Sequence, residues 1–165
     1  MFLSFDKMPD YSRLWIYQVD RELTDSEVIA ISSILKDFLE HWESHGNSLI
    51  GSFQIRLNRF VILAVNEQLT KASGCSIDKS VEIMKTIEEE FDIALFDRTK
   101  IAYMHENNIK TTSLVNIKEK ISLGEIKAET IIFDNLILIK EQLESQWQNA
   151  AGKTWLKRYF QNVLL

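Results

Sequence analysis

Residues 60–65 are Phe60-Val61-Ile62-Leu63-Ala64-Val65, the longest uninterrupted apolar run in the chain. The run is too short for a membrane-spanning helix, which needs about 18 residues or more. It also lacks the alternation of a strand with one wet face, so it predicts a strand that is buried on both faces. We therefore expect this strand to lie in the middle of a sheet, with the rest of the fold built around it.

Three further segments are predicted to be strands. Residues 53–58 alternate between apolar and polar side chains, which is typical of a strand with one wet face, and the chain then turns near Asn58-Arg59. Residues 13–19 are rich in aromatic and β-branched side chains, and residues 99–104 are the fourth predicted strand.

Two amphipathic helices are predicted between these strands. Thr24-Asp25-Ser26-Glu27 is a capping box, in which the side chains of Thr24 and Glu27 each bind the other residue's backbone N–H. Apolar residues then recur at helical spacing, so we expect a helix over about 25–44 that ends at His45-Gly46, with Gly46 in the left-handed conformation. The second helix follows a polar loop and has apolar residues at Ile77, Val81, Met84, Ile87 and Phe91.

The order strand, helix, strand, strand, helix, strand predicts an α+β fold with a ferredoxin-like βαββαβ core over about 12–105. Its sheet should be mainly antiparallel, with both helices on one face because the crossovers are right-handed. Both faces of residues 14–19 and 60–65 are apolar, so the second face of the sheet also needs a cover. Residues 106–165 or a second copy of the chain, in a homodimer, would supply that cover.

The C-terminal third, residues 106–165, is predicted to be a hairpin followed by helices. Glu106-Asn107-Asn108 suits a hairpin turn because Asn tolerates positive φ. A short helix is expected over about 116–123. Residues 130–133 are either a strand followed by a helix through Trp147, which we favour, or the start of one long helix. A final helix would contain Trp155, Leu156, Tyr159, Phe160 and Val163. Without a linker or an internal repeat, residues 1–165 are interpreted as one domain with an elaborated helical C-terminal extension.

Composition restricts the compartment and the partners. The formal net charge is -5, which disfavours a bulk electrostatic grip on nucleic acid or anionic lipid. The N-terminus lacks the pattern of a secretion signal, and the single cysteine, Cys75, suits a reducing compartment. We therefore expect a cytoplasmic protein with no nucleic-acid or membrane partner. The one segment that mixes aromatic and basic residues, Lys153 to Arg158, is interpreted as an amphipathic helix.

Neither of two glycine-containing fragments completes a phosphate-binding loop. Gly46 and Gly51 have the required spacing, but Ser52-Phe53 stands where the motif needs Lys followed by Ser or Thr. Gly152-Lys153-Thr154 supplies that ending, but Trp147 occupies the position of the first glycine. The sequence therefore predicts that this protein is not an ATPase.

No metal site or cofactor is expected. His41 and His45 are four residues apart, but a metal needs three or four ligands, and His105 could approach them only through tertiary folding. Near a helix end, such histidines more often stabilise the negative end of the helix dipole.

Ser73-Gly74-Cys75-Ser76-Ile77-Asp78-Lys79-Ser80 is the segment that most favours a functional site. It places small residues and a lone thiol at the start of a helix, where free N–H groups attract an anion. Ser73, Gly74, Cys75, Ser76, Asp78 and Lys79 are the candidate ligand-binding residues, with Ser76 as the expected helix cap. Under the alternative interpretation, Ser76 is only a cap and Cys75 a small buried hydrophobic residue.

Three functions remain open at this level. The leading hypothesis is a protein that binds a small anionic ligand or a partner, with Arg56, Arg59 and His45 lining the same pocket. The second is an enzyme that uses Cys75 as a nucleophile or redox thiol with a histidine base such as His45. The third is a structural oligomerisation module that uses the open face of its sheet.

Four stretches, Arg13 to Gln18, Trp42 to Gly46, Asn58 to Leu63 and Ser73 to Ser80, together resemble a family of small bacterial proteins of uncharacterised function. Members of this family are often labelled ABC-transporter ATPases although they lack Walker motifs. The resemblance covers most of the chain and implies a soluble bacterial protein, but it supplies no catalytic residues.

Overall fold

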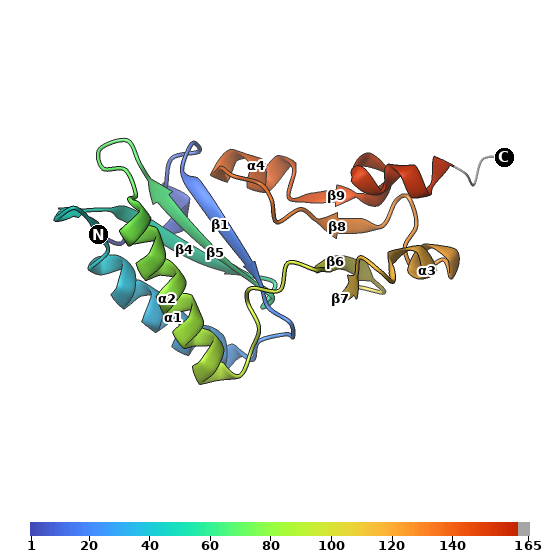
Figure 1. The fold of residues 1–165 in the computed structure, drawn as a ribbon, viewed down its shortest axis with the longest axis horizontal. Coiled ribbons are helices and arrows are strands. Elements are labelled where there is room, and N and C mark those ends of the chain that lie inside the picture. Colours follow the sequence, from blue (N-terminus) through green and yellow to red (C-terminus); the bar gives the residue numbers. More distant parts are fainter. Residues whose placement is uncertain (162–165) are drawn as a thin grey trace. The chain divides into compact units, whose positions relative to one another are not determined.

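The computed structural model describes residues 1–161, which form two compact units (Figure 1). Unit 1 contains Met1–Phe96 together with Leu138–Glu141, and unit 2 contains Asp97–Ile137 and the chain from Gln142 onward. The fold is α+β with mainly antiparallel sheets, which confirms the predicted class. No helix in the described part of the chain is long and apolar enough to cross a membrane.

Unit 1 is built around a three-stranded antiparallel sheet in the order β1-β5-β4. The central strand, β5, contains the predicted run, and every residue from Phe60 to Val65 is fully buried. Helices α1 and α2 lie side by side on one face of this sheet (Figure 1). The elements are η1 (Phe5–Lys7), β1 (Arg13–Gln18), α1 (Asp25–Glu40), β2 (Glu43–Ser44), β3 (Asn47–Ser48), β4 (Ile50–Arg56), β5 (Phe60–Asn66) and α2 (Gly74–Phe91).

The complete ferredoxin-like sheet is not confirmed. The order β1-β5-β4 matches its first, third and second strands, but the expected fourth strand, β6 (Lys100–His105), belongs to the sheet of unit 2. The outer edge of β1 is instead taken by residues 138–140. Leu14 N–H donates to the carbonyl oxygen of Leu138 at 2.8 Å, and Lys140 N–H donates to that of Ser12 at 2.9 Å. Because these bonds already use backbone groups of the β1 edge, those groups are not available to pair with β6.

The first helix is shorter than predicted. The capping box of Thr24 and Glu27 is present, but α1 ends at Glu40 rather than near residue 44. Residues 43–48 form the small β2–β3 hairpin, whose two turn residues are His45 at φ 51° and Gly46 at φ 76°. Gly46 therefore adopts the expected left-handed conformation, but in a hairpin turn and not at a helix end.

Unit 2 contains a four-stranded antiparallel sheet in the order β7-β6-β8-β9. The predicted hairpin is confirmed, with Glu106 and Asn107 at positive φ between β6 and β7. The predicted helical extension is not confirmed, because the described helices are short and strands lie between them. The remaining elements are β7 (Asn108–Ser113), α3 (Ile117–Ser122), β8 (Ile131–Phe133), α4 (Lys140–Ser145), β9 (Gln148–Ala150), η2 (Ala151–Lys153) and η3 (Trp155–Tyr159).

The last predicted helix is only the 3-10 helix η3 in the described part of the chain, and Val163 lies outside the described residues. Leu156 is fully buried in the core of unit 2, with Tyr103, Ile117 and Ile132, whereas Trp155 is half-exposed. Trp155 is therefore not a core residue.

The second face of the unit 1 sheet is also buried, since Leu14, Ile16 and Ile62 are each at most 3% exposed. Residues before β1 form part of the same unit: η1 lies beside β4, and Met8 is buried. The proposal that residues 106–165 or a second copy cover this face stays a prediction.

Candidate functional site

The start of α2 is fixed by hydrogen bonds between two serines. Ser73 is the N-cap, and its hydroxyl oxygen accepts from the backbone N–H of Ser76 at 3.2 Å. The Ser76 hydroxyl donates back to the Ser73 carbonyl oxygen at 2.8 Å. The prediction that Ser76 caps the helix is therefore wrong by three residues, and Cys75 lies in the first helical turn.

Trp42 ties the first turns of α2 to the chain that follows α1. Its indole Nε1–H donates to the Ser76 carbonyl oxygen at 2.8 Å, and the side chain is almost fully buried. The indole ring packs over Gly51 of β4, where an added Cβ would lie 3.2 Å from the ring. The start of α2 is therefore held against the end of the sheet where β4 begins.

The first turn of α2 faces solvent and has free donors. Gly74 and Cys75 are exposed, and their backbone N–H groups have no hydrogen-bond partner within residues 1–161. The first turn contains no acidic residue, so nothing in it compensates the positive end of the helix dipole. In α1, by contrast, Asp25 and Glu27 supply that negative charge. Asp78 and Lys79 are exposed in the following turn.

The β2–β3 hairpin places two more polar residues near this helix, because β2 lies against α2. His45 is exposed in the turn of the hairpin. Ser44, next to it, is only 2% exposed, and its hydroxyl has no hydrogen-bond partner in the described structure. A buried hydroxyl normally has a partner, so Ser44 is an unsatisfied polar group beside the helix.

Cys75 is a free, exposed cysteine, so the buried-hydrophobic interpretation of this residue is wrong. No hydrogen bond connects its thiol to a histidine anywhere in residues 1–161. An adjacent base is one way to activate a cysteine nucleophile, and a helix N-terminus is another, so the hypothesis that Cys75 is a nucleophile stays a prediction.

Arg56 and Arg59 lie at the opposite end of the sheet. In the β4–β5 pairing, Arg56 is opposite Phe60, whereas the start of β4 is opposite Asn66. The seven residues of β4 separate these ends by about 20 Å. Arg59 lies near Asp20 and Glu22. Burial lowers the pKa of its guanidinium, although the two carboxylates raise it. Neither arginine is brought to the start of α2.

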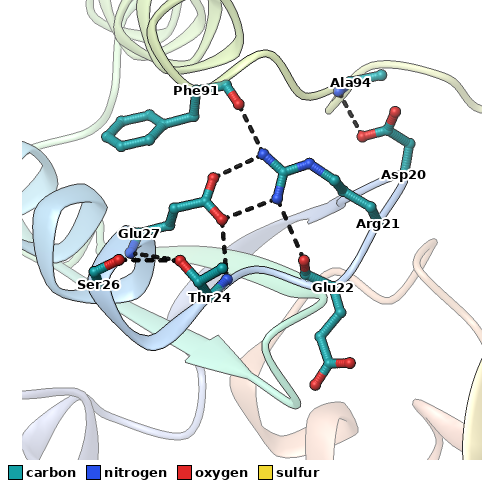
Figure 2. Close-up of polar contacts among 8 residues, drawn as sticks. All are labelled: Asp20, Arg21, Glu22, Thr24, Ser26, Glu27, Phe91 and Ala94. Atoms are coloured by element: carbon teal, nitrogen blue, oxygen red, sulfur yellow. Dashed lines mark hydrogen bonds and ion pairs between the residues drawn. The ribbon is translucent and has the colours of Figure 1, made fainter.

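That opposite end contains a polar network centred on Arg21, which the sequence did not single out (Figure 2). Its guanidinium forms two bonds to the Glu27 carboxylate, at 2.9 and 2.7 Å, and one to the Phe91 carbonyl oxygen at 2.8 Å. Arg21 therefore joins the start of α1 to the end of α2. The hydrogen bonds from Arg21 and Thr24 hold the pKa of Glu27 at about 2.

Unit 2 has a second network around Glu125. The buried Tyr103 hydroxyl donates to its carboxylate at 2.6 Å, and Lys120 Nζ donates at 2.9 Å. The Tyr103 and Lys120 hydrogen bonds lower the pKa of Glu125 to about 2, while burial and the adjacent carboxylate raise the pKa of Tyr103. A tyrosine that stays neutral and bonded to a paired carboxylate stabilises the structure of the unit and is not a free acid or base.

Across residues 1–161, no group of three or more His, Cys, Asp or Glu side chains is placed to hold a metal ion. His41 closes α1 at its C-cap, with its ring Nδ1 2.9 Å from the Asp37 carbonyl oxygen. Compared with known proteins, the chain matches no family model, no curated protein and no solved structure. The site therefore rests on the geometry of this chain alone.

Two residues of the candidate site, Trp42 and Ser44, are not among those predicted from the sequence. Both fall inside the helix predicted over about 25–44, whereas α1 ends at Glu40. A tryptophan followed by polar residues and a His-Gly pair fits a hairpin as well as a helix end. Only the observed end of α1 shows which of the two occurs.

Proposed function

We propose that this chain is a binding protein for a small anion, such as a phosphate or carboxylate group, and that the anion binds at the exposed start of α2. The observation that supports this most directly is the pair of free backbone N–H groups at Gly74 and Cys75, at the positive end of an 18-residue helix. Because the single cysteine suits a reducing compartment, we place this activity in the cytoplasm.

The site is held in place before any ligand arrives. Ser73 caps the helix and Trp42 bonds its first turn, so the two donors lose little conformational freedom on binding. The buried Ser44 hydroxyl on the neighbouring hairpin is a second polar group without a partner in the described residues. An anion, or a water bound to it, would give this hydroxyl a hydrogen-bond partner. The unsatisfied hydroxyl therefore supports ligand binding more than the helix start does by itself.

Phosphate titration followed by amide NMR tests the proposal. We expect the Gly74 and Cys75 amide signals to move with saturable dependence on phosphate. The matched control is the start of α1, where the Asp25 and Ser26 amides should not move because Glu27 already supplies a negative charge. Equal shifts at both helix starts, or no shift at Gly74 and Cys75, would contradict the site.

Labelling of Cys75 separates binding from thiol chemistry. Iodoacetamide should label the exposed thiol of the native protein, and phosphate should slow that labelling more than the same ionic strength of sodium chloride does. A Ser73→Ala variant should lose part of this protection because the helix start is less well ordered. Rapid labelling that phosphate does not change would instead favour the thiol as the functional group.

A further inference from the structure

The outer edge of β4 is only partly occupied. Its first groups are used by the N-terminus: Gly51 N–H donates to the Met1 carbonyl oxygen at 3.1 Å, and Leu3 N–H donates to the Gly51 carbonyl oxygen at 3.0 Å. Backbone groups of alternate strand residues point the same way. Phe53 and Ile55 therefore present their N–H and C=O groups along this edge, where the described residues offer them no hydrogen-bond partner.

From this edge we infer that two copies of the chain pair through β4, antiparallel, with Gln54 of one copy opposite Gln54 of the other. An open strand edge is a ready template for another strand, and many proteins cover or charge such edges. In β4, Phe53-Gln54-Ile55 contains neither Pro nor a charged residue. This inference is independent of the anion site.

The free groups define one register. Centring the pair on Gln54 places Phe53 opposite Ile55 of the second copy, so all the free groups of both residues are used. Centring it on Phe53 would bring Ile55 against Gly51, whose groups are already bonded to residues 1–3. Centring it on Ile55 would bring Phe53 against Leu57, where the chain turns at positive φ and leaves the strand.

The side chains are self-complementary in that register. Phe53 and Ile55 lie on the face of the sheet covered by the helices and are only partly buried, so each would gain an apolar cross-strand neighbour. On the other face, Gln54 meets Gln54, and Arg56 faces Ser52. No two like charges are directly opposed, which removes the usual obstacle to pairing identical strands.

Disulfide trapping tests the register directly. In a Cys75→Ser background, Gln54→Cys should form an intermolecular disulfide on mild oxidation, because its Cβ lies about 5 Å from that of its counterpart. The matched control is Arg56→Cys on the same face, whose counterpart is displaced by about 13 Å along the strand. Trapping at Gln54 and not at Arg56 supports the pairing, and the reverse or neither overturns it.

Sedimentation of the full chain provides the second measurement. Ile55→Pro removes an outward N–H without breaking the bonds between β4 and β5, so the variant should fold yet dimerise at least about tenfold more weakly. Ile55→Val keeps the N–H and should still dimerise. A wild-type chain that stays monomeric at high concentration overturns the proposal.

Discussion

Three hairpin turns in residues 1–161 each contain two residues in the left-handed region. The turns at His45-Gly46 and Glu106-Asn107 contain Gly or Asn, which reach positive φ at low cost. The β4–β5 turn contains Leu57 at φ 56° and Asn58 at φ 52°. Leu57, like His45 and Glu106, is neither Gly nor Asn, and a leucine pays about 1–2 kcal/mol in this conformation.

Replacing Leu57 with asparagine should therefore stabilise the fold. The side chain is 52% exposed, so Leu57→Asn loses little packing and removes most of the conformational cost. We expect the free energy of unfolding to rise by about 1 kcal/mol in urea titrations. The matched variant Asn58→Leu should lower it by a similar amount, and a loss of stability in Leu57→Asn would show that the leucine packs on something essential.

Glu27 should make the stability of unit 1 depend on acidity. Its pKa in the folded protein is about 2, below the ordinary 4.5, so the ionised form stabilises the fold. That contribution is complete above pH 4.5 and is lost as the pH falls towards 2. Glu27→Gln retains the capping geometry but loses the ion pair with Arg21.

The measurement is urea unfolding of both proteins over a series of pH values. The free energy of unfolding of wild type should exceed that of Glu27→Gln by a constant amount around neutral pH. This difference should shrink as the pH falls below 4.5. Glu89→Gln, at an exposed position of α2, is the matched control for removing a carboxylate. A difference that is the same at every pH would mean that the ion pair contributes nothing.

Among the elements, α1 and the chain that follows it pack closely on β4 at Gly51. An added Cβ there would lie 2.8 Å from Leu39 Cδ2 and 3.2 Å from the Trp42 ring, so the sheet approaches the helix layer at a residue without a side chain. The same tryptophan bonds the first turn of α2. The packing of Trp42 on β4 and the position of the candidate site therefore depend on each other.

Gly51→Ala should destabilise the protein by about 1–3 kcal/mol through overpacking. It should also change the environment of the Trp42 indole and weaken the phosphate-dependent shifts at Gly74. Gly74→Ala is the matched control, because an added Cβ at that position meets nothing within 4 Å. We expect this control to fold with equal or slightly higher stability, since alanine is the better helix former. Urea unfolding of both variants distinguishes these outcomes.

At the scale of the whole molecule, charge is unevenly divided. Unit 1 has 17 acidic and ten basic residues, whereas unit 2 has seven acidic and nine basic residues. The net charge of -5 therefore combines an acidic unit with a slightly basic one. The negative charge of unit 1 disfavours binding to nucleic acid or anionic lipid. The charge of unit 2 does not.

ATP should not bind specifically to this chain. Gly46 lies in a hairpin turn and Gly51 within β4, and Gly152-Lys153-Thr154 lies in and just after the 3-10 helix η2. Neither fragment forms the strand, loop and helix that place backbone N–H groups around phosphates. Calorimetry with millimolar Mg-ATP is the direct check. We expect no saturable heat, and a micromolar dissociation constant would refute the prediction.

Local features of the sequence determined much of this protein. The capping box of Thr24 and Glu27, the buried central strand at 60–65 and the hairpin turn at Glu106-Asn107 all occur as predicted. Each depends on residues close in sequence, through a cap bond, a hydrophobic pattern or a φ preference. Local residues also predicted a helix start within Ser73–Ser80, although the cap is Ser73 rather than Ser76.

Competition between distant segments decided the rest. Residues 138–140 take the edge of β1, so β6 joins another sheet, and the Trp42 bond to Ser76 accompanies an earlier end of α1. The distance from Arg59 to the start of α2 also follows from strand pairing. Periodicity shows which residues can form a strand or line a helix face. It does not show which neighbour will satisfy a given edge, because that depends on segments brought together only in the folded chain.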